Sequence, residues 1–275
     1  MLGQDLAPVL RAAGHRVTAL SHSDLDVTDA IAVQAAVDGH DVVVNAAAFT
    51  RVDDAETEHA AATAVNALGA GTLAAASAIA DARFIQISTD YVFDGRARQP
   101  YAEGTPVSPL SVYGRSKAEG ERLAMIAHPD GAIILRTAWL YGAHGANFVS
   151  AVLGRAASNE TVAVLTDQLG QPTWTVDLAE RILSVGEARI PAGIYHATNS
   201  GATSRFDFAR EIFRLAGLDA ARVIPIAGGA DDRPAPRPAY SVLGHEAWAR
   251  AGMTEMRPWQ DALAAASAAG VLAAP

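Results

Sequence analysis

Tyr113 and Lys117 are the residues of this sequence whose types and spacing most clearly allow chemistry. They stand at the two ends of Tyr113-Gly114-Arg115-Ser116-Lys117, four positions apart, so on a helix they share one face. A free phenol has a pKa of about 10, and a nearby ammonium group favours the phenolate and lowers that pKa. The pair could therefore relay a proton to a reacting group. By itself the spacing fits an ordinary surface helix equally well, so the neighbouring segments must decide.

Two hydroxyl residues, Ser88 and Thr89, stand where a predicted buried strand at 83–88 ends. Side chains at the carboxyl end of such a strand lie in the ligand crevice of an open α/β sheet. Thr89 could there hydrogen-bond a substrate carbonyl or the hydroxyl of Tyr113. The alternative is that both hydroxyls only cap backbone amides of the following loop. Because the segment with Tyr113 and Lys117 comes next along the chain, we favour the catalytic role for Thr89.

Two other segments could hold a flat nucleotide cofactor. Small alanine side chains at 46–48, where a predicted strand at 41–46 ends, would let the backbone approach adenosine or pyrophosphate. Asp26, after a predicted strand at 16–20, could bind the edge of an adenine ring. The alternatives are a tightly packed turn for the alanines and a helix cap for Asp26. No acidic residue and no arginine ends the strand at 16–20, so the choice between NADH and NADPH stays open.

The elements that must position these side chains alternate along the chain. We predict strands at 16–20, 41–46, 83–88, 132–136 and 193–197 and helices at 30–37, 56–82, 112–127, 148–157, 176–185, 205–216 and 259–269. Such alternation predicts right-handed crossovers and a parallel sheet covered on both faces, a Rossmann-like doubly wound α/β fold. The three prolines of 232–238 predict an extended loop. We place a dinucleotide-binding domain at 1–145 and a smaller substrate-binding lobe, interleaved with it, at 146–275.

The start of the chain departs from this plan. Residues 6–13 predict a helix, and Gly3 would be the last glycine of the turn before it. A dinucleotide-binding fold places a strand and two earlier glycines ahead of such a helix. We therefore expect the first strand to be missing from the sequence as given. The alternative is a polypeptide that simply begins with a helix.

The bulk composition excludes several classes of function. The chain has 275 residues, of which 50% are hydrophobic and 19% charged, as in a globular protein with a substantial core. A net charge of −9 argues against nucleic acid as a partner. No cysteine is present, which rules out disulfides and thiolate catalysis. No apolar run approaches the roughly 20 residues of a membrane span, and no basic segment opens a signal peptide, so we expect a cytoplasmic protein without a membrane partner. The eight histidines show no ligand-like spacing, so we expect no metal.

Six segments, in this order, carry a resemblance to a known family. They are Val44-Asn45-Ala46-Ala47-Ala48-Phe49-Thr50-Arg51-Val52-Asp53, Ser88-Thr89-Asp90-Tyr91-Val92-Phe93-Asp94-Gly95, Val112-Tyr113-Gly114-Arg115-Ser116-Lys117, Leu135-Arg136-Thr137-Ala138-Trp139-Leu140-Tyr141-Gly142, Asp167-Gln168-Leu169-Gly170-Gln171-Pro172-Thr173 and Arg237-Pro238-Ala239-Tyr240-Ser241. Over nearly the whole chain they resemble the dTDP-4-dehydrorhamnose reductase family of the extended short-chain dehydrogenase/reductase superfamily. The missing strand and glycines at the start are where the chain departs from that family.

The resemblance implies a role for each matching residue. Tyr113 would be the general acid, Lys117 would tune it and hold the cofactor's ribose, and Thr89 would be the third catalytic member. Thr89, Asp90 and Trp139 would contact a dTDP-sugar. The expected contacts to NADPH or NADH are Leu2, Gly3, Asp26, Val27, Ala46, Ala47, Ala48, Tyr113 and Lys117. Without the resemblance, Trp139 would be taken for a core aromatic residue at a strand end.

The reaction implied is reduction of the 4-ketone of dTDP-4-dehydro-L-rhamnose to give dTDP-L-rhamnose, with a homodimer as one allowed assembly. Two other functions stay open. The first is another sugar-nucleotide ketoreductase or an epimerase of the same fold, because fold does not fix the substrate. The second is a non-catalytic regulatory homologue that has kept the fold. The presence of Thr89, Tyr113 and Lys117 together favours an enzyme.

Overall fold

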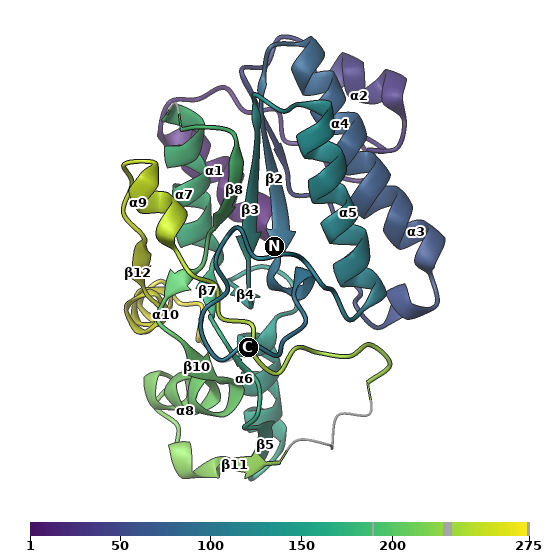
Figure 1. The fold of residues 1–275 in the computed structure, drawn as a ribbon. Helices are drawn as coiled ribbons and strands as arrows, with labels where there is room; N and C mark the ends of the chain where they lie inside the picture. The colour runs from purple at the N-terminus through teal and green to yellow at the C-terminus, as the bar shows by residue number, and fades with distance from the viewer. Residues whose placement is uncertain (189, 228–232, 274–275) are drawn as a thin grey trace.

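The structure, a computed structural model, describes residues 1–188, 190–227 and 233–273. Its central sheet is parallel, with the strand order β1-β2-β3-β8 (Figure 1). The strands are β1 (Val42–Asn45), β2 (Arg83–Thr89), β3 (Ala132–Thr137) and β8 (Gly193–His196). In register, Thr89 of β2 lies opposite Thr137 of β3, so the carboxyl ends of these strands meet at one edge of the sheet.

Helices cover both faces of this sheet. The first face carries α2 (Ala30–Val37), α4 (Gly69–Ile79) and α5 (Val112–Ala127), and the second carries α1 (Leu2–Ala12) and α7 (Thr175–Glu187). Successive side chains of a strand point to opposite faces, so Phe84 of β2 packs in the first core and Ile85 in the second. Figure 1 shows the two groups of helices on opposite sides of the strands. The prediction of a Rossmann-like doubly wound fold is confirmed.

The long helix predicted at 56–82 is shorter and is not uniform. It comprises α3 (His59–Thr63), a π-helical turn at Ala64–Leu68, and α4. Its 21 residues, His59–Ile79, are long and apolar enough to cross a membrane by length and composition, contrary to the expectation that no apolar run approaches such a length. Half of its most apolar stretch is buried inside the protein, where α4 packs on α5 and α2. That packing is typical of a core helix in a layered α/β fold.

The remaining elements form a smaller lobe and the segments that join it to the sheet. The helices are α6 (Phe148–Ser158), α8 (Arg205–Leu215), α9 (Glu246–Arg250) and α10 (Trp259–Ala268), with short 3₁₀ turns at Asp54–Glu56, Asp90–Val92 and Ala220–Arg222. The strands are β4 (Leu140–Tyr141), β5 (Val162–Leu165), β6 (Leu169–Gly170), β7 (Thr173–Trp174), β9 (Asn199–Ser200), β10 (Thr203–Ser204), β11 (Val223–Ile226) and β12 (Met256–Pro258). They pair two by two rather than extending the main sheet.

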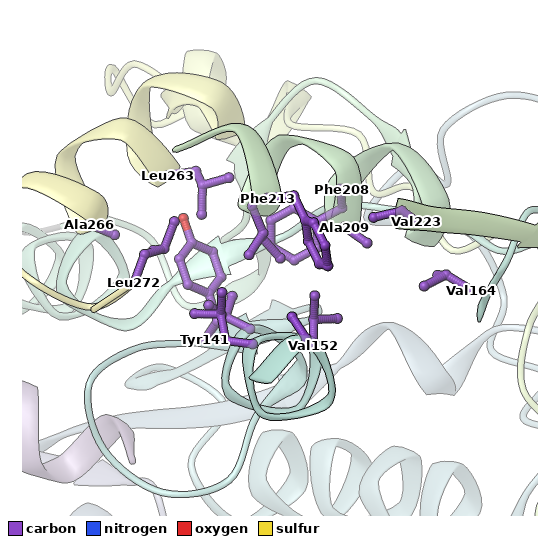
Figure 2. Packing of buried hydrophobic residues seen from close by; sticks show 14 of the residues in the cluster. Tyr141, Val152, Val164, Phe208, Ala209, Phe213, Val223, Leu263, Ala266 and Leu272 are labelled. Carbon is purple, nitrogen blue, oxygen red and sulfur yellow. The ribbon is translucent and has the colours of Figure 1, made fainter. Parts of the chain in front are cut away.

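The lobe has an apolar core of its own. Phe208 and Phe213 of α8 are fully buried there and pack with Tyr141, as Figure 2 shows from close by. Leu263 of α10 and Val152 of α6 close the same cluster. Between lobe segments the chain returns to the sheet through α7 and β8, which matches an interleaved arrangement. The boundary at residue 145 stays a prediction.

Two predictions about the start of the chain are wrong. Residues 16–20 form no strand, because a strand needs a hydrogen-bonded partner and, within the described ranges, β1 pairs only with β2. Leu20 is instead 47% exposed, and Thr18 contacts His40 through a hydrogen bond of 3.0 Å. Gly3 lies inside helix α1, which begins at Leu2, rather than in a turn before it. The predicted loop at 232–238 is neither helix nor strand from 233 on, and Asp232 lies outside the described residues.

Candidate active site

Thr89, Tyr113 and Lys117 come together at the carboxyl end of β2, as predicted from their spacing. Thr89 is the last residue of β2, and its side chain hydrogen-bonds that of Tyr113 in the first turn of α5. Lys117 lies one turn further along α5, and its Nζ donates to the carbonyl oxygen of Ile87 at 2.6 Å. Thr89 and Lys117 are buried, whereas Tyr113 stays partly exposed. The Tyr113 hydroxyl is therefore held by Thr89, while part of the Tyr113 residue stays accessible.

The start of α5 is fixed by its own caps and by one close contact. The Ser111 hydroxyl accepts a hydrogen bond from the backbone N–H of Gly114 at 3.1 Å, and Glu56 accepts one from the N–H of Val112 at 2.7 Å. At Gly114 a Cβ atom would lie 2.2 Å from the carbonyl oxygen of Tyr91, so only glycine lets the helix approach this loop so closely. These contacts place Tyr113 beside Thr89.

The environment of Tyr113 keeps its phenol protonated. Burial raises its pKa well above 10, the negative charges at Asp90 and Tyr91 raise it further, and the hydrogen bond with Thr89 opposes the shift. Lys117 was expected to lower this pKa, but it is not among the groups that shift it here. A protonated phenol at neutral pH suits a proton donor rather than a base.

Lys117 is a buried cation close to its neutral form. Burial lowers its pKa from 10.5 to about 8, and the carboxylate of Glu121 opposes the shift. At neutral pH the ammonium form therefore still predominates, but by a small margin. Glu121 stands four residues after Lys117, as Lys117 stands four after Tyr113, so the three side chains follow one face of α5.

Beneath Lys117 a buried network of charges crosses the sheet. Arg136 of β3 donates to both carboxylate oxygens of Glu121, at 2.9 and 2.7 Å, and Ser88 donates to the same carboxylate at 2.5 Å. On its other side Arg136 lies 3.5 Å from Nε2 of His196, whose Nδ1 is 2.8 Å from the carbonyl oxygen of Gly244. Burial, with Arg136, lowers the pKa of His196 to about 3, so this ring is neutral and accepts from Arg136. This network was not predicted from the sequence, although the four-residue spacing of Glu121 was its visible signal.

Asn66 is a second residue that sequence analysis missed. It lies on the π-helical turn, is buried, and exchanges two hydrogen bonds with the backbone of Phe49, at 2.8 and 3.1 Å. Its amide also donates to the hydroxyl of Ser116 at 2.9 Å. A polar residue in an alanine-rich helix was the available signal, and π-helical turns often mark functional sites. Asn66 thereby ties the loop after β1 to α5.

Asp90 and Trp139, expected with Thr89 to contact the substrate, lie at the same edge of the sheet. Asp90 follows Thr89 and accepts a hydrogen bond from its hydroxyl at 3.0 Å. It is only 2% exposed. Burial raises the pKa of Asp90 to about 6, against the lowering effect of the nearby Ser241 and Thr89 hydroxyls. Trp139 follows β3 with a backbone φ of +46°, an uncommon conformation for a bulky residue. Such strain is found mostly where function demands it.

The segments expected to hold a nucleotide cofactor offer bare backbone. Ala46 and Ala47, just after β1, are exposed, and Ala48 is half-buried. Leu2 buries its side chain in the core, so only its backbone could bind, and the space around Gly3 is open. No side chain caps the start of α1, so its first N–H groups are available to a phosphate. These features fit the pyrophosphate of a dinucleotide.

Asp26 and Val27 lie farther along this side, near α2 and α4. Asp26 is exposed and accepts hydrogen bonds from the backbone and the hydroxyl of Thr28, which lower its pKa. Val27 packs against Gly69 at the start of α4. Asp29, not Asp26, caps α2, so the alternative interpretation of Asp26 as a helix cap is wrong. The contact of Asp26 with a cofactor stays a prediction.

Comparison with known proteins places the chain among sugar-nucleotide enzymes. A family model described as the RmlD substrate binding domain matches residues 1–271. A protein of Streptomyces griseus named dTDP-4-dehydrorhamnose reductase is 50% identical over 269 residues, which cover 96% of this chain and 88% of the relative. A protein of Streptomyces niveus named dTDP-4-keto-6-deoxy-D-glucose reductase is 45% identical, over 96% of this chain and 92% of the relative.

Solved structures agree with the fold. A dTDP-4-dehydrorhamnose reductase of Bacillus anthracis, in complex with NADP, has a TM-score of 0.91 at 34% identity and covers 95% of this chain and 93% of its own. The same named enzyme of Clostridium acetobutylicum has a TM-score of 0.90 at 39% identity, with coverages of 96% and 94%. The chain therefore belongs to the RmlD substrate binding domain family, and its resemblance to the dTDP-4-dehydrorhamnose reductases is confirmed.

Proposed function

We propose that this protein reduces the 4-ketone of dTDP-4-dehydro-L-rhamnose to the alcohol of dTDP-L-rhamnose, with NADPH or NADH as the hydride donor. The observation that carries the proposal is the convergence of Thr89, Tyr113 and Lys117 at the carboxyl end of β2. The relative from Streptomyces griseus bears the name of this activity, and the structure from Bacillus anthracis contains NADP. The named relatives thus support the class of substrate, and the geometry of the three side chains supports proton transfer to a ketone.

In the proposed mechanism the chain provides the proton and the alignment. A reduced nicotinamide would supply the hydride that adds to the carbonyl carbon. The Tyr113 hydroxyl donates its proton to the carbonyl oxygen, which becomes the new hydroxyl group. Thr89, already hydrogen-bonded to Tyr113, stabilises the phenolate by turning its hydroxyl proton from Asp90 to the phenolate oxygen, until a proton returns from solvent. Lys117 holds a positive charge beneath the site and would bind the cofactor's ribose. Asp90 and Trp139 would contact the sugar.

The direct test is turnover of dTDP-4-dehydro-L-rhamnose, followed by loss of nicotinamide absorbance and by NMR of the product. We expect Tyr113→Phe to fold normally and to lose turnover by orders of magnitude, because phenylalanine lacks the hydroxyl that donates the proton in this mechanism. Tyr195→Phe is the matched control, since Tyr195 lies in β8 and its hydroxyl donates to the carbonyl oxygen of Pro191 at 2.9 Å. Near-normal turnover by Tyr113→Phe would exclude Tyr113 as the acid.

A second candidate function is reduction of a different dTDP-4-keto sugar. It is favoured by the Streptomyces niveus relative, whose name specifies dTDP-4-keto-6-deoxy-D-glucose. A panel of dTDP- and UDP-linked 4-keto sugars would separate the two reductases, and an epimerase would return a ketone instead of an alcohol. A regulatory homologue would bind such sugars without consuming the nicotinamide.

The setting of the enzyme is also a proposal. We infer cytoplasmic activity, because a nicotinamide cofactor and a nucleotide sugar are both intracellular metabolites and the chain contains no cysteine. We infer two units, a dinucleotide-binding domain at 1–145 and a substrate lobe at 146–275, from the separate apolar core of the lobe. A homodimer is the assembly that sedimentation of the purified protein would test.

A further inference from the structure

Arg205 is a charged residue at the junction of the lobe and the sheet. It is the first residue of α8, and its guanidinium carbon lies 3.5 Å from the centre of the Trp139 ring and 4.8 Å from that of Phe148. Burial lowers its pKa to about 10, so it stays charged at neutral pH. Across the ranges that the structure describes, its side chain forms neither a hydrogen bond nor an ion pair. A partly buried cation with five unused N–H donors is suited to an anionic ligand.

The position of Arg205 matches one part of a nucleotide sugar. Its charge acts on Tyr91 and Asp90, and the Tyr91 ring stands 5.7 Å from that of Tyr113. In the substrate the ketone is on C4 and the diphosphate on C1, at opposite ends of the sugar ring. With the ketone at Tyr113, the diphosphate lies at the end of the sugar ring away from the reacting hydroxyl, so a cation that is close to Asp90 and Tyr91 suits it.

Trp139 holds the guanidinium plane in place. The Trp139 ring is accommodated by Gly170 of β6, where a Cβ atom would lie 2.5 Å from the ring. Packing against Gly170 and Arg205 restricts rotation of the Trp139 ring. A guanidinium stacked on a fixed ring keeps its donor edge aimed in one direction, which favours bidentate binding of a phosphate.

A second arginine near the site is already engaged. Arg237 donates to both carboxylate oxygens of Asp53, at 2.5 and 2.8 Å. The protein as a whole carries a net charge of −9, which repels a diphosphate. A local cation without a carboxylate partner is therefore needed to bind one, and Arg205 meets that need.

We infer that Arg205 binds the diphosphate of the nucleotide sugar and that Trp139 orients it. This assignment rests on the proposed function, because it takes a nucleotide sugar as the ligand. It differs from a purely structural role in one respect. The contribution of Arg205 must depend on the phosphates of the ligand and not on its base or its sugar.

The test compares thymidine 5′-diphosphate with thymidine. Arg205→Gln removes the charge, Arg205→Lys keeps the charge without the planar fork, and Arg210→Gln is the control because Arg210 is exposed on the same helix. Calorimetry measures the affinity for thymidine 5′-diphosphate, and NMR titration measures the affinity for thymidine. We expect Arg205→Gln to weaken the binding of thymidine diphosphate by about 10- to 100-fold and Arg205→Lys to weaken it by less. Thymidine and NADPH should bind all proteins alike.

Two results would overturn the assignment. The first is unchanged diphosphate affinity in Arg205→Gln, and the second is an equal loss for thymidine and its diphosphate. If Arg205→Gln unfolds, the ratio of the two affinities in Arg205→Lys decides in the same way. These outcomes are separate from the proposed function, because a wild-type protein that binds thymidine diphosphate without reducing the ketone refutes the reaction and leaves Arg205 testable.

Discussion

Replacing Glu121 by glutamine should destabilise the protein far more than its size suggests. The Glu121 side chain is 5% exposed and that of Arg136 is 2% exposed. Glu121 accepts two hydrogen bonds from Arg136 and one from Ser88. Glutamine has the same shape, but it loses the negative charge and turns an N–H₂ group toward a guanidinium or hydroxyl donor. Arg136 would then be a buried cation without a counter-ion.

The size of the effect follows from this burial. Breaking a buried ion pair by removing one partner costs about 3–5 kcal/mol, because the remaining charge stays desolvated. Domains are stable by only about 5–15 kcal/mol, so Glu121→Gln should lose a large share of the total. Glu119 provides the matched control on the same helix. Its pair with Arg122, at 2.6 Å, is exposed and should contribute less than about 1 kcal/mol.

Urea unfolding followed by circular dichroism measures both variants. We expect a clear loss of unfolding free energy for Glu121→Gln and almost none for Glu119→Gln. The double variant Glu121→Met/Arg136→Met should recover most of that loss, since it leaves no unpaired charge. If Glu121→Gln is as stable as Glu119→Gln, the buried network does not hold the site and the reasoning is wrong. The pH dependence of activity gives a second, independent measurement. Without Glu121 the pKa of Lys117 should fall below about 8, and the alkaline limb of kcat/KM should move to lower pH.

Two further variants test the site from other directions. Asp90 is protonated more readily in the folded protein, with a pKa of about 6 against 3.8, so its stabilising contribution is present below pH 3.8 and is lost as the pH rises through 6. In thermal unfolding, Asp90→Asn should therefore increase the free energy of unfolding by on the order of 3 kcal/mol at pH 8 and leave it unchanged at pH 3. Its activity should fall. Equal increases in stability at both pH values would contradict this reasoning. Gly114→Ala should displace the start of α5 and lower kcat at least about tenfold, whereas Gly154→Ala, with open space at its Cβ, should leave kcat unchanged.

The fold could be predicted where the local pattern and the final packing agree. Helix α5 occurs at the predicted residues 112–127, because Ser111 caps it and its glycines allow close packing. Helix α2 likewise occurs at the predicted residues 30–37, where Asp29 caps it by accepting two backbone N–H groups. The strand predicted at 16–20 failed for a reason that no local pattern contains. A strand exists only with a paired neighbour, and that depends on the rest of the sheet.

The site divides in the same way. Tyr113, Lys117 and Thr89 could be found because their spacing and their place after a strand have a direct chemical meaning. The role of Arg136 could not be found, since an arginine in an apolar strand looks like an edge residue. Only the structure shows that its guanidinium lies buried against Glu121. The pKa of Tyr113 was also beyond reach, because it depends on burial and on Asp90 more than on the nearby lysine.

The charges beneath the site explain why the polar network cannot be an ordinary apolar core. Lys117 must be buried to stand under the reacting hydroxyl, and burial alone lowers its pKa toward neutrality. Glu121, one turn away, counters that shift, and Arg136 in turn neutralises Glu121. On the other side of Arg136, His196 is neutral and accepts a hydrogen bond from it, so the row of charged side chains ends at His196. Apolar residues at 121 and 136 could fill the same volume and keep the fold. They could not keep Lys117 charged, so the double methionine variant should be stable and yet turn over slowly at the pH where the wild-type protein works best.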